Sequence, residues 1–159
     1  MRVLLDEDVP KQLLEPLRHL TRGRHEVVHV ADTRLKGRKD VPLLKEAARQ
    51  GFEAVVTNDA AQLDDPTETR AIKQSGLHHV RYSQRHHGLR GLALALGALV
   101  AELPSVLDEL STASSQRLVR IQGLDPSRKR YEIVDPSQEP PKYWPRGRGD
   151  GRRRRPSPH

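Results

Sequence analysis

The sequence contains no cysteine among its 159 residues, so disulfide bonds and zinc sites with thiolate ligands are excluded. Its eight histidines include two adjacent pairs, His78–His79 and His86–His87. Neighbouring residues of a strand point to opposite faces, so we do not expect His78 and His79 to share a metal ion. A metal site in this chain is therefore expected to use oxygen ligands.

Long apolar segments are also lacking. The N-terminal residues MRVLLDED have no apolar core of the kind that a signal peptide carries. The most apolar run, residues 88–103, is interrupted by Arg90 and is shorter than the ~20 residues that a membrane span requires. We therefore predict a soluble, cytoplasmic protein without a membrane partner.

The basic charge is confined to the end of the chain. The net charge is +7, and the residues from Lys142 onward (one Lys, six Arg and one Asp) account for +6 of it. This Pro-, Gly- and Arg-rich segment has almost no aliphatic residues, so we predict a disordered tail over residues 136–159. The tail would either bind nucleic acid without sequence preference or keep the protein soluble. Residues 1–135 are predicted to form one domain, with its core in residues 1–82.

Apolar patterns alternate between strand and helix through the first half of the chain. Short apolar runs predict buried strands, and stripes at helical spacing predict helices that start near Pro10, Asp40 and Pro66 and end near Gly23, Gly51 and Gly76. This order predicts a three-layer α/β/α fold with a parallel central sheet. The predicted strands are residues 2–5, 26–30, 53–57 and 78–82, and the predicted helices are residues 10–20, 41–50 and 67–75.

The second half is predicted to add two helices and a hairpin. One helix covers about residues 89–102, and a second follows Pro104. Residues 116–135 indicate two strands around an Asp-Pro-Ser turn, which is typical of a β-hairpin. The apolar helix carries small residues at Gly91, Ala95 and Ala98. We expect it to pack in the core, and a homodimer interface is the alternative.

Three acids follow or precede elements at one edge of the predicted sheet. Asp6 ends the first strand, Asp59 follows the third, and Asp40 begins a helix near the same edge. Ligands bind beyond the carboxyl ends of strands in open parallel sheets. Asp6 continues directly from a buried run, so a partner cation is expected beside it. Asp8, two residues before Pro10, is predicted to be a helix cap.

A fourth acid, Glu68, lies on the buried stripe of its own short helix, three and four residues before Ala71 and Ile72. The helix N-terminus offers it a structural role as an alternative. The four acids Asp6, Asp40, Asp59 and Glu68 can converge, and such hard oxygen ligands favour Mg²⁺ or Mn²⁺. The preceding loop carries four basic residues that suit a bridging phosphate, unless it is an ordinary exposed loop: Arg34, Lys36, Arg38 and Lys39.

Four segments of the first 82 residues resemble, in order and spacing, the PIN-like domains of toxin nucleases. These segments are LLDEDVP, HEVVHVADTRLKGRKDVPLLKEA, VVTNDAAQL and PTETRAIKQSG. The relatives share an L-D-E-N-x-P opening, an H-[DE]-V-x-x-V strand, a G-x-x-D step, a T-x-D turn and a P-x-E helix. Asp8 stands where Asn is usual, and Asn58 stands where Arg is frequent.

The resemblance implies a PIN fold with four or five parallel strands and a metal-dependent ribonuclease activity. It also implies that the protein is the toxin of a toxin–antitoxin pair, with RNA as substrate and an antitoxin protein as partner. Carried over residue by residue, Asp6, Asp40, Asp59 and Glu68 match the acidic metal-ligand positions, and Thr57 matches the supporting hydroxyl. The Arg-rich tail lies outside the resemblance.

Two other functions are alternatives to the nuclease. A phosphoacceptor regulator of the receiver type also has acids at strand ends, but it needs a Lys at a later strand end, and HHVRYSQRHH offers none. A catalytically silent module of the same fold, binding nucleic acid or a protein partner, is compatible with the sequence. The sequence therefore predicts the nuclease, with the silent module as the alternative.

Overall fold

The structure is a computed structural model, and it describes residues 1–58, 61–84, 87–125, 127, 132–136, 138–139 and 141. The chain divides into two compact units, Met1–Pro126 and Ser127–His159. Every helix and strand assigned to the described residues belongs to the first unit. Nearly all of the predicted tail, residues 136–159, lies outside the described residues.

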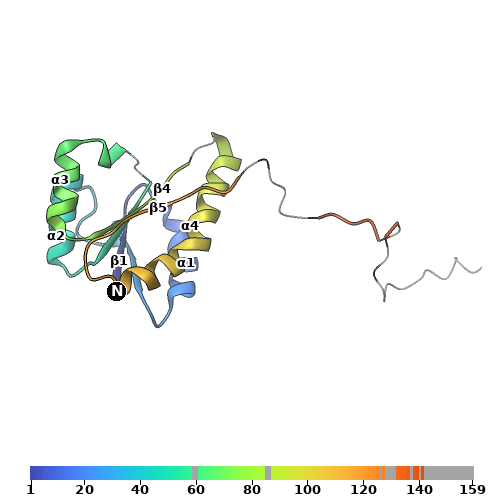
Figure 1. Cartoon of the computed structure of the whole chain (residues 1–159), viewed down its shortest axis with the longest axis horizontal. Helices are drawn as coiled ribbons and strands as arrows, with labels where there is room; N and C mark the ends of the chain where they lie inside the picture. The colour runs from blue at the N-terminus through green and yellow to red at the C-terminus, as the bar shows by residue number, and fades with distance from the viewer. Residues whose placement is uncertain are drawn as a thin grey trace, which may run out of the picture. The chain divides into compact units, whose positions relative to one another are not determined.

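A five-stranded, entirely parallel sheet forms the centre of the first unit (Figure 1). The strand order is β2-β1-β3-β4-β5. Its central strands are rich in Val and Leu, as expected where both faces of a parallel sheet are covered. The predicted parallel sheet and its first four strands are confirmed. The strands are β1 Arg2–Leu5, β2 Glu26–His29, β3 Ala54–Thr57, β4 His78–Tyr82 and β5 Leu118–Ile121.

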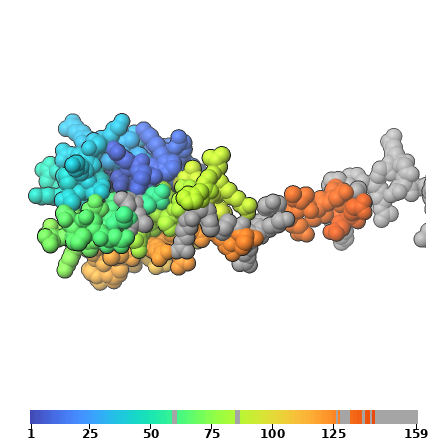
Figure 2. Space-filling view, turned by 90° about the horizontal axis from the view of Figure 1, so that it is seen from above, coloured from blue at the N-terminus to red at the C-terminus, as the bar shows by residue number. Residues whose placement is uncertain are grey.

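Helices cover both faces of the sheet, which gives the predicted three-layer α/β/α arrangement. Helices α1 and α4 lie on one face, and α2 and α3 lie side by side on the other (Figures 1 and 2). Short 3₁₀ turns precede α1 and follow the ends of β2 and β3. The elements are η1 Lys11–Leu13, α1 Leu14–Thr21, η2 Val30–Asp32, α2 Asp40–Arg49, η3 Ala61–Leu63, α3 Pro66–Ser75 and α4 Gly88–Ser111.

Local sequence signals explain where α3 begins and ends. The Asp65 carboxylate accepts hydrogen bonds from the backbone N–H groups of Thr67 (2.7 Å) and Glu68 (2.9 Å), and Pro66 occupies the first turn. The helix ends at Gly76, whose φ of 71° is left-handed and therefore favours glycine. The α3 boundaries follow from these three residues.

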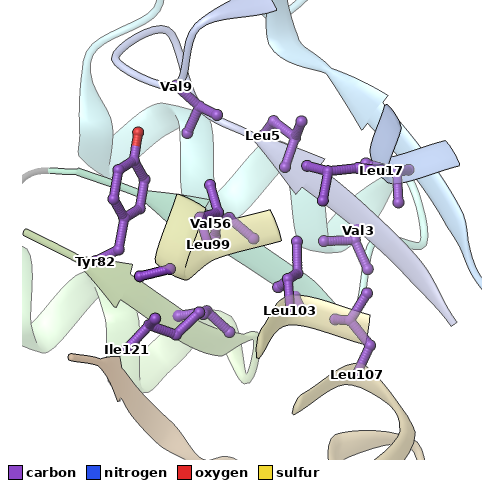
Figure 3. Packing of buried hydrophobic residues seen from close by; sticks show 14 of the residues in the cluster. Val3, Leu5, Val9, Leu17, Val56, Tyr82, Leu99, Leu103, Leu107 and Ile121 are labelled. Atoms are coloured by element: carbon purple, nitrogen blue, oxygen red, sulfur yellow. The ribbon is translucent and has the colours of Figure 1, made fainter. Parts of the chain in front are cut away.

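Alternate residues of each strand feed two separate hydrophobic clusters. Leu5, Val56 and Val80 pack toward α1 and α4, with the cluster shown in Figure 3. Leu4 and Val55 pack toward α2 and α3 on the opposite face. Each fully buried leucine contributes roughly 1.5–3 kcal/mol relative to exposure. The two clusters hold the sheet between its helix layers.

The prediction of two helices in the second half is wrong, because α4 continues through Pro104. Leu99, Leu103 and Leu107 are fully buried on both sides of the proline, and this packing outweighs the hydrogen bond that proline cannot donate. Helix α4 is long and apolar enough to cross a membrane, and 33% of its most apolar 18-residue segment is buried in the fold. We interpret it as a core helix, since its buried stripe packs on the sheet.

The hairpin predicted over residues 116–135 is not formed by the described residues. Its first strand, β5, pairs in parallel with β4, and residues 132–135 belong to no strand, while residues 126 and 128–131 lie outside the described residues. The direction of β5 follows from α4, which carries the chain back along the sheet. Strand β5 therefore begins at the same edge of the sheet as β4. Only Ile121 of β5 is buried, which is consistent with an edge strand.

Candidate active site

The candidate site lies where the chain reverses its direction across the sheet. From β1 the chain goes outward to β2 and then returns past β1 to β3, and ligands in open α/β sheets bind at such a switch point. The backbone N–H of Asp6 donates to Val56 O (2.9 Å) and extends the ladder one residue beyond β1. The chain then turns, and Val9 N donates back to Asp6 O (3.1 Å).

Asp6 is a buried carboxylate, with 9% of the residue exposed. Burial raises the pKa of Asp6 to about 6, and the negative charges of Asp8 and Asp40 act in the same direction. A hydrogen bond from Glu7 N (2.8 Å) and the nearby Thr57 hydroxyl oppose the rise in pKa. These surroundings favour either a proton or a cation beside Asp6.

The neighbouring Asp8 joins the ends of β1 and β3. Its carboxylate accepts hydrogen bonds from Thr57 Oγ1 (3.0 Å) and from the backbone N–H of Asn58 (3.0 Å). The cap prediction for Asp8 is wrong, since η1 is preceded by Pro10 and has no side-chain cap. Thr57 is fully buried at the end of β3, so its hydroxyl sits between the two aspartates.

A cavity of about 190 Å³ opens at these strand ends, and we call it the acidic pocket. It brings together the predicted residues Asp6 and Asp40, and it adds Glu7 and Asp8. Asp40 is half-buried and is the first residue of α2, one position later than a cap. The lining residues are Asp6, Glu7, Asp8, Val30, Arg38, Asp40, Leu43 and Gln62.

Comparison with protein families decides the classification. A family model described as a PIN-like domain matches residues 1–84, which is more than half of the chain. The chain belongs to the PIN-like domain family. PIN-like domains are a family of nucleases, and the resemblance of the sequence to PIN-like domains is confirmed. Neither the curated proteins nor the solved structures yield a match to this PIN-like chain.

Two of the acids predicted for the PIN-like site are not placed in the acidic pocket. Glu68 is half-buried in the first turn of α3 and is not among the described residues that line the cavity. Asp59 lies outside the described residues. The described part of the PIN-like domain therefore combines Asp6 and Asp40 with Asp8, a residue that sequence reasoning assigned elsewhere.

The basic loop before α2 contributes one residue to the acidic pocket. Arg38 lines the cavity, whereas Arg34, Lys36 and Lys39 are exposed and are not among its lining residues. The loop is fastened to the site by Gly37, whose backbone N–H donates to Glu7 Oε1 (2.6 Å). Arg38 is thus the predicted phosphate contact that the fold brings closest to the acids.

One histidine supports the PIN-like site, a role that the sequence alone does not reveal. The buried His29 faces Val9 O through Nε2 (2.7 Å), and its Nδ1 accepts from Ala31 N (3.1 Å). It therefore ties the turn after Asp6 to the end of β2. The only signal in the sequence is the position of His29 at the carboxyl end of a predicted strand.

The chemistry of the acidic pocket fits a hard divalent cation. Its carboxylates are the oxygen ligands that Mg²⁺ and Mn²⁺ prefer. Two buried polar atoms near Asp8, Asn58 Oδ1 and the Tyr82 hydroxyl, have no hydrogen-bond partner within the described part of the chain. Burial and the charge of Asp8 raise the pKa of Tyr82. No group of three or more acids or histidines close enough to hold a metal occurs among the described residues.

Proposed function

We propose that this PIN-like protein is a Mg²⁺- or Mn²⁺-dependent endoribonuclease that hydrolyses phosphodiester bonds of RNA. The observation that carries the proposal is the buried Asp6 carboxylate sharing one pocket with Asp8 and Asp40. A buried carboxylate beside two further negative charges is costly unless a cation neutralises them. Membership of a nuclease family supports the same reaction.

Each residue of the site has a distinct proposed role. Asp6 and Asp59 are the principal metal ligands, and Asp40 and Glu68 complete the site directly or through water. A divalent ion held by these residues would supply the chemistry that activates a water and stabilises the leaving oxygen of the phosphodiester. Thr57 supports the site by donating its hydroxyl to Asp8, which holds the turn after Asp6 against β3. Arg38 attracts the substrate phosphate, while Arg34, Lys36 and Lys39 add positive charge around it.

The test is cleavage of a mixed RNA pool by the purified full-length protein in Mn²⁺. EDTA and the Asp6→Asn variant are the two controls, and circular dichroism verifies that the variant is folded. We expect cleavage in Mn²⁺ that is lost in both controls. Cleavage that persists in Asp6→Asn would remove Asp6 from the mechanism.

A catalytically silent PIN-like module is the second candidate. Its support is Glu68, a predicted ligand that is not among the described residues lining the acidic pocket. Such a module would bind RNA or a protein partner through the same edge of the sheet without turnover. Folded protein that binds RNA but cleaves none in Mg²⁺ or Mn²⁺ would decide for this alternative.

We further propose that the nuclease acts in the cytoplasm as a toxin restrained by an antitoxin protein. The support is the resemblance of the first 82 residues to toxin nucleases. Induced expression of the wild-type chain in a bacterial host should arrest growth, and expression of Asp6→Asn should not. Growth that is unaffected by an active wild-type enzyme would separate the nuclease activity from a toxin role.

A further inference from the structure

A second pocket lies beyond the acidic pocket, at the carboxyl ends of β4 and β5. It has a volume of about 190 Å³, and we call it the arginine pocket. Two guanidinium groups and one carboxylate give it a net positive lining, whereas carboxylates outnumber Arg38 in the acidic pocket. The lining residues are Asp64, Arg81, Tyr82, Ser83 and Arg120.

The two pockets are connected by one row of residues across the sheet. Thr57 pairs with Arg81, and Arg81 pairs with Arg120. Asp6 extends this row on the other side of Thr57. Leu5 of β1 pairs with Val56 of β3, and the hydrogen bond from Asp6 N to Val56 O continues the pairing of the two strands by one residue, so Asp6 lies beside Thr57. Partners in a parallel ladder point to the same face. Asp6, Thr57 and the two arginines therefore form one row, and their side chains lie on the face of the sheet that α2 and α3 cover.

Strand spacing gives the length of this row. Adjacent strands lie ~4.8 Å apart, so Arg81 is about 10 Å and Arg120 about 14 Å from the strand that carries Asp6. A nucleic-acid strand that crosses the sheet edge at right angles to the strands would present one phosphate at the acidic pocket. A neighbouring phosphate would then reach the arginines.

The arginines have the chemistry for this contact. A guanidinium group binds phosphate oxygens with two parallel hydrogen bonds. Arg120 is exposed and forms no ion pair with any described residue. Ser83, directly after β4, offers a hydroxyl to the same pocket. Asp64 is the one lining group that would repel an anion.

We propose that the arginine pocket binds a second phosphate of the RNA strand, next to the phosphate held at the acidic pocket. This proposal rests on the proposed ribonuclease function and assigns the direction in which the substrate crosses the sheet. The RNA strand crosses the carboxyl edge of the sheet in the direction from β1 toward β5. Arg81 and Arg120 are positioning residues, since they act away from the bond that breaks.

Binding of a fluorescent single-stranded RNA hexanucleotide to the full-length protein tests the arginine pocket. Anisotropy is measured in EDTA over a range of salt concentrations, so that no cleavage occurs. We expect Arg120→Gln and Arg81→Gln each to weaken binding about tenfold at low salt and to reduce the slope of log K against log salt by about 0.7. Asp64→Asn should strengthen binding, because it removes the repelling carboxylate.

Arg117→Gln is the matched control. Arg117 is an exposed arginine just before β5, does not line the arginine pocket, and bonds instead to Ser115. All variants keep the basic tail, so its contribution cancels. If Arg120→Gln binds the hexanucleotide like Arg117→Gln, with the same salt slope, the arginine pocket is not a phosphate site. Because Arg120 is exposed, this result cannot be attributed to misfolding.

Cleavage kinetics separate this proposal from the proposed function. In Mn²⁺, Arg120→Gln should raise KM for the hexanucleotide without changing kcat, and it should cleave a dinucleotide at the wild-type rate. A loss of dinucleotide cleavage would place Arg120 at the scissile phosphate and overturn the second site. A wild-type protein that neither binds nor cleaves RNA would overturn both proposals, whereas wild-type cleavage with indifferent arginine variants would overturn this one alone.

Discussion

At the scale of single residues, ionised Asp6 is electrostatically unfavourable in the folded protein. Its carboxylate is buried beside two other acids, and this raises its pKa from 3.8 to about 6. A group with a raised pKa in the folded state favours folding most when it is protonated. The stability that depends on Asp6 is therefore fully present below about pH 4 and is lost as pH rises through about 6.

Asp6→Asn should stabilise the metal-free protein at pH 7.5, because it removes a buried charge. The shift in pKa sets an upper figure of ~3 kcal/mol for the gain in free energy of unfolding. Thermal unfolding in EDTA at pH 4 and at pH 7.5 measures it, and the difference between variant and wild type should vanish at pH 4. Added Mn²⁺ should stabilise the wild type only. A variant less stable than wild type at pH 7.5 in EDTA would contradict this account of Asp6.

Asp8 and Thr57 should be energetically coupled through the hydrogen bond that joins them (3.0 Å). In a double-mutant cycle with Asp8→Ala and Thr57→Val, we expect a coupling energy of about 1 kcal/mol in the free energy of unfolding. Thr33→Val is the control partner, since the Thr33 hydroxyl donates to Val30 O and should add independently to Asp8→Ala. Equal coupling in both cycles would argue against a specific link.

The site was only partly predictable from single residues. Asp6 and Asp40 were found because each one borders an element with a clear apolar pattern, and the order of the elements fixes which edge they share. Asp8 was misassigned because a short loop before a proline looks the same whether its acid caps a helix or bonds to a distant strand. Only the return of β3 beside β1 brings Thr57 and Asn58 within reach of it.

At the scale of elements, the same reasoning separates the two halves of the chain. The strands up to β4 alternate with helices that end close to a glycine, and the predicted boundaries agree to within about two residues. The exception is α1, which begins at Leu14 rather than at residue 10 because the 3₁₀ turn η1 precedes it. In contrast, Pro104 indicated a helix boundary, and Asp125-Pro126-Ser127 indicated a hairpin turn. Both signals are local, and packing of Leu103 and Leu107 on the sheet overrode the first. The crossover through α4 fixes the direction of β5 beside β4, and the described residues 132–135 form no second strand of a hairpin.

Replacing Pro104 with Ala should stabilise the protein. Alanine restores a backbone donor inside α4 and relieves the ring's clash with the preceding turn, effects that cost up to ~3 kcal/mol for proline in a helix. Greater freedom of the unfolded chain offsets up to about 1 kcal/mol, so we expect a net gain of roughly 1–2 kcal/mol. Chemical denaturation measures it, and Ser105→Ala at the exposed neighbouring position is the control. A loss of stability would mean that α4 requires a bend at Pro104.

At the scale of the whole molecule, stability and charge are carried by different parts of the chain. Both hydrophobic clusters and all five strands lie in the unit Met1–Pro126. Residues 127–141 contain three basic and three acidic residues, and residues 142–159 contribute +6, so residues 127–159 carry +6 of the net +7. The folded unit is therefore nearly neutral, and its long-range attraction for a polyanion comes from residues outside its core.

Truncation after Pro126 should separate these two properties. We expect the melting temperature to stay within about 2 °C of wild type, since no described residue of either hydrophobic cluster is removed. Non-specific affinity for RNA at low salt should fall and depend less on salt, because fewer counterions are released. The control is the full-length chain with its six arginines from residue 146 onward changed to glutamine, which should lose the affinity equally. Loss of folding on truncation alone would show that residues 127–159 take part in the stability of the domain.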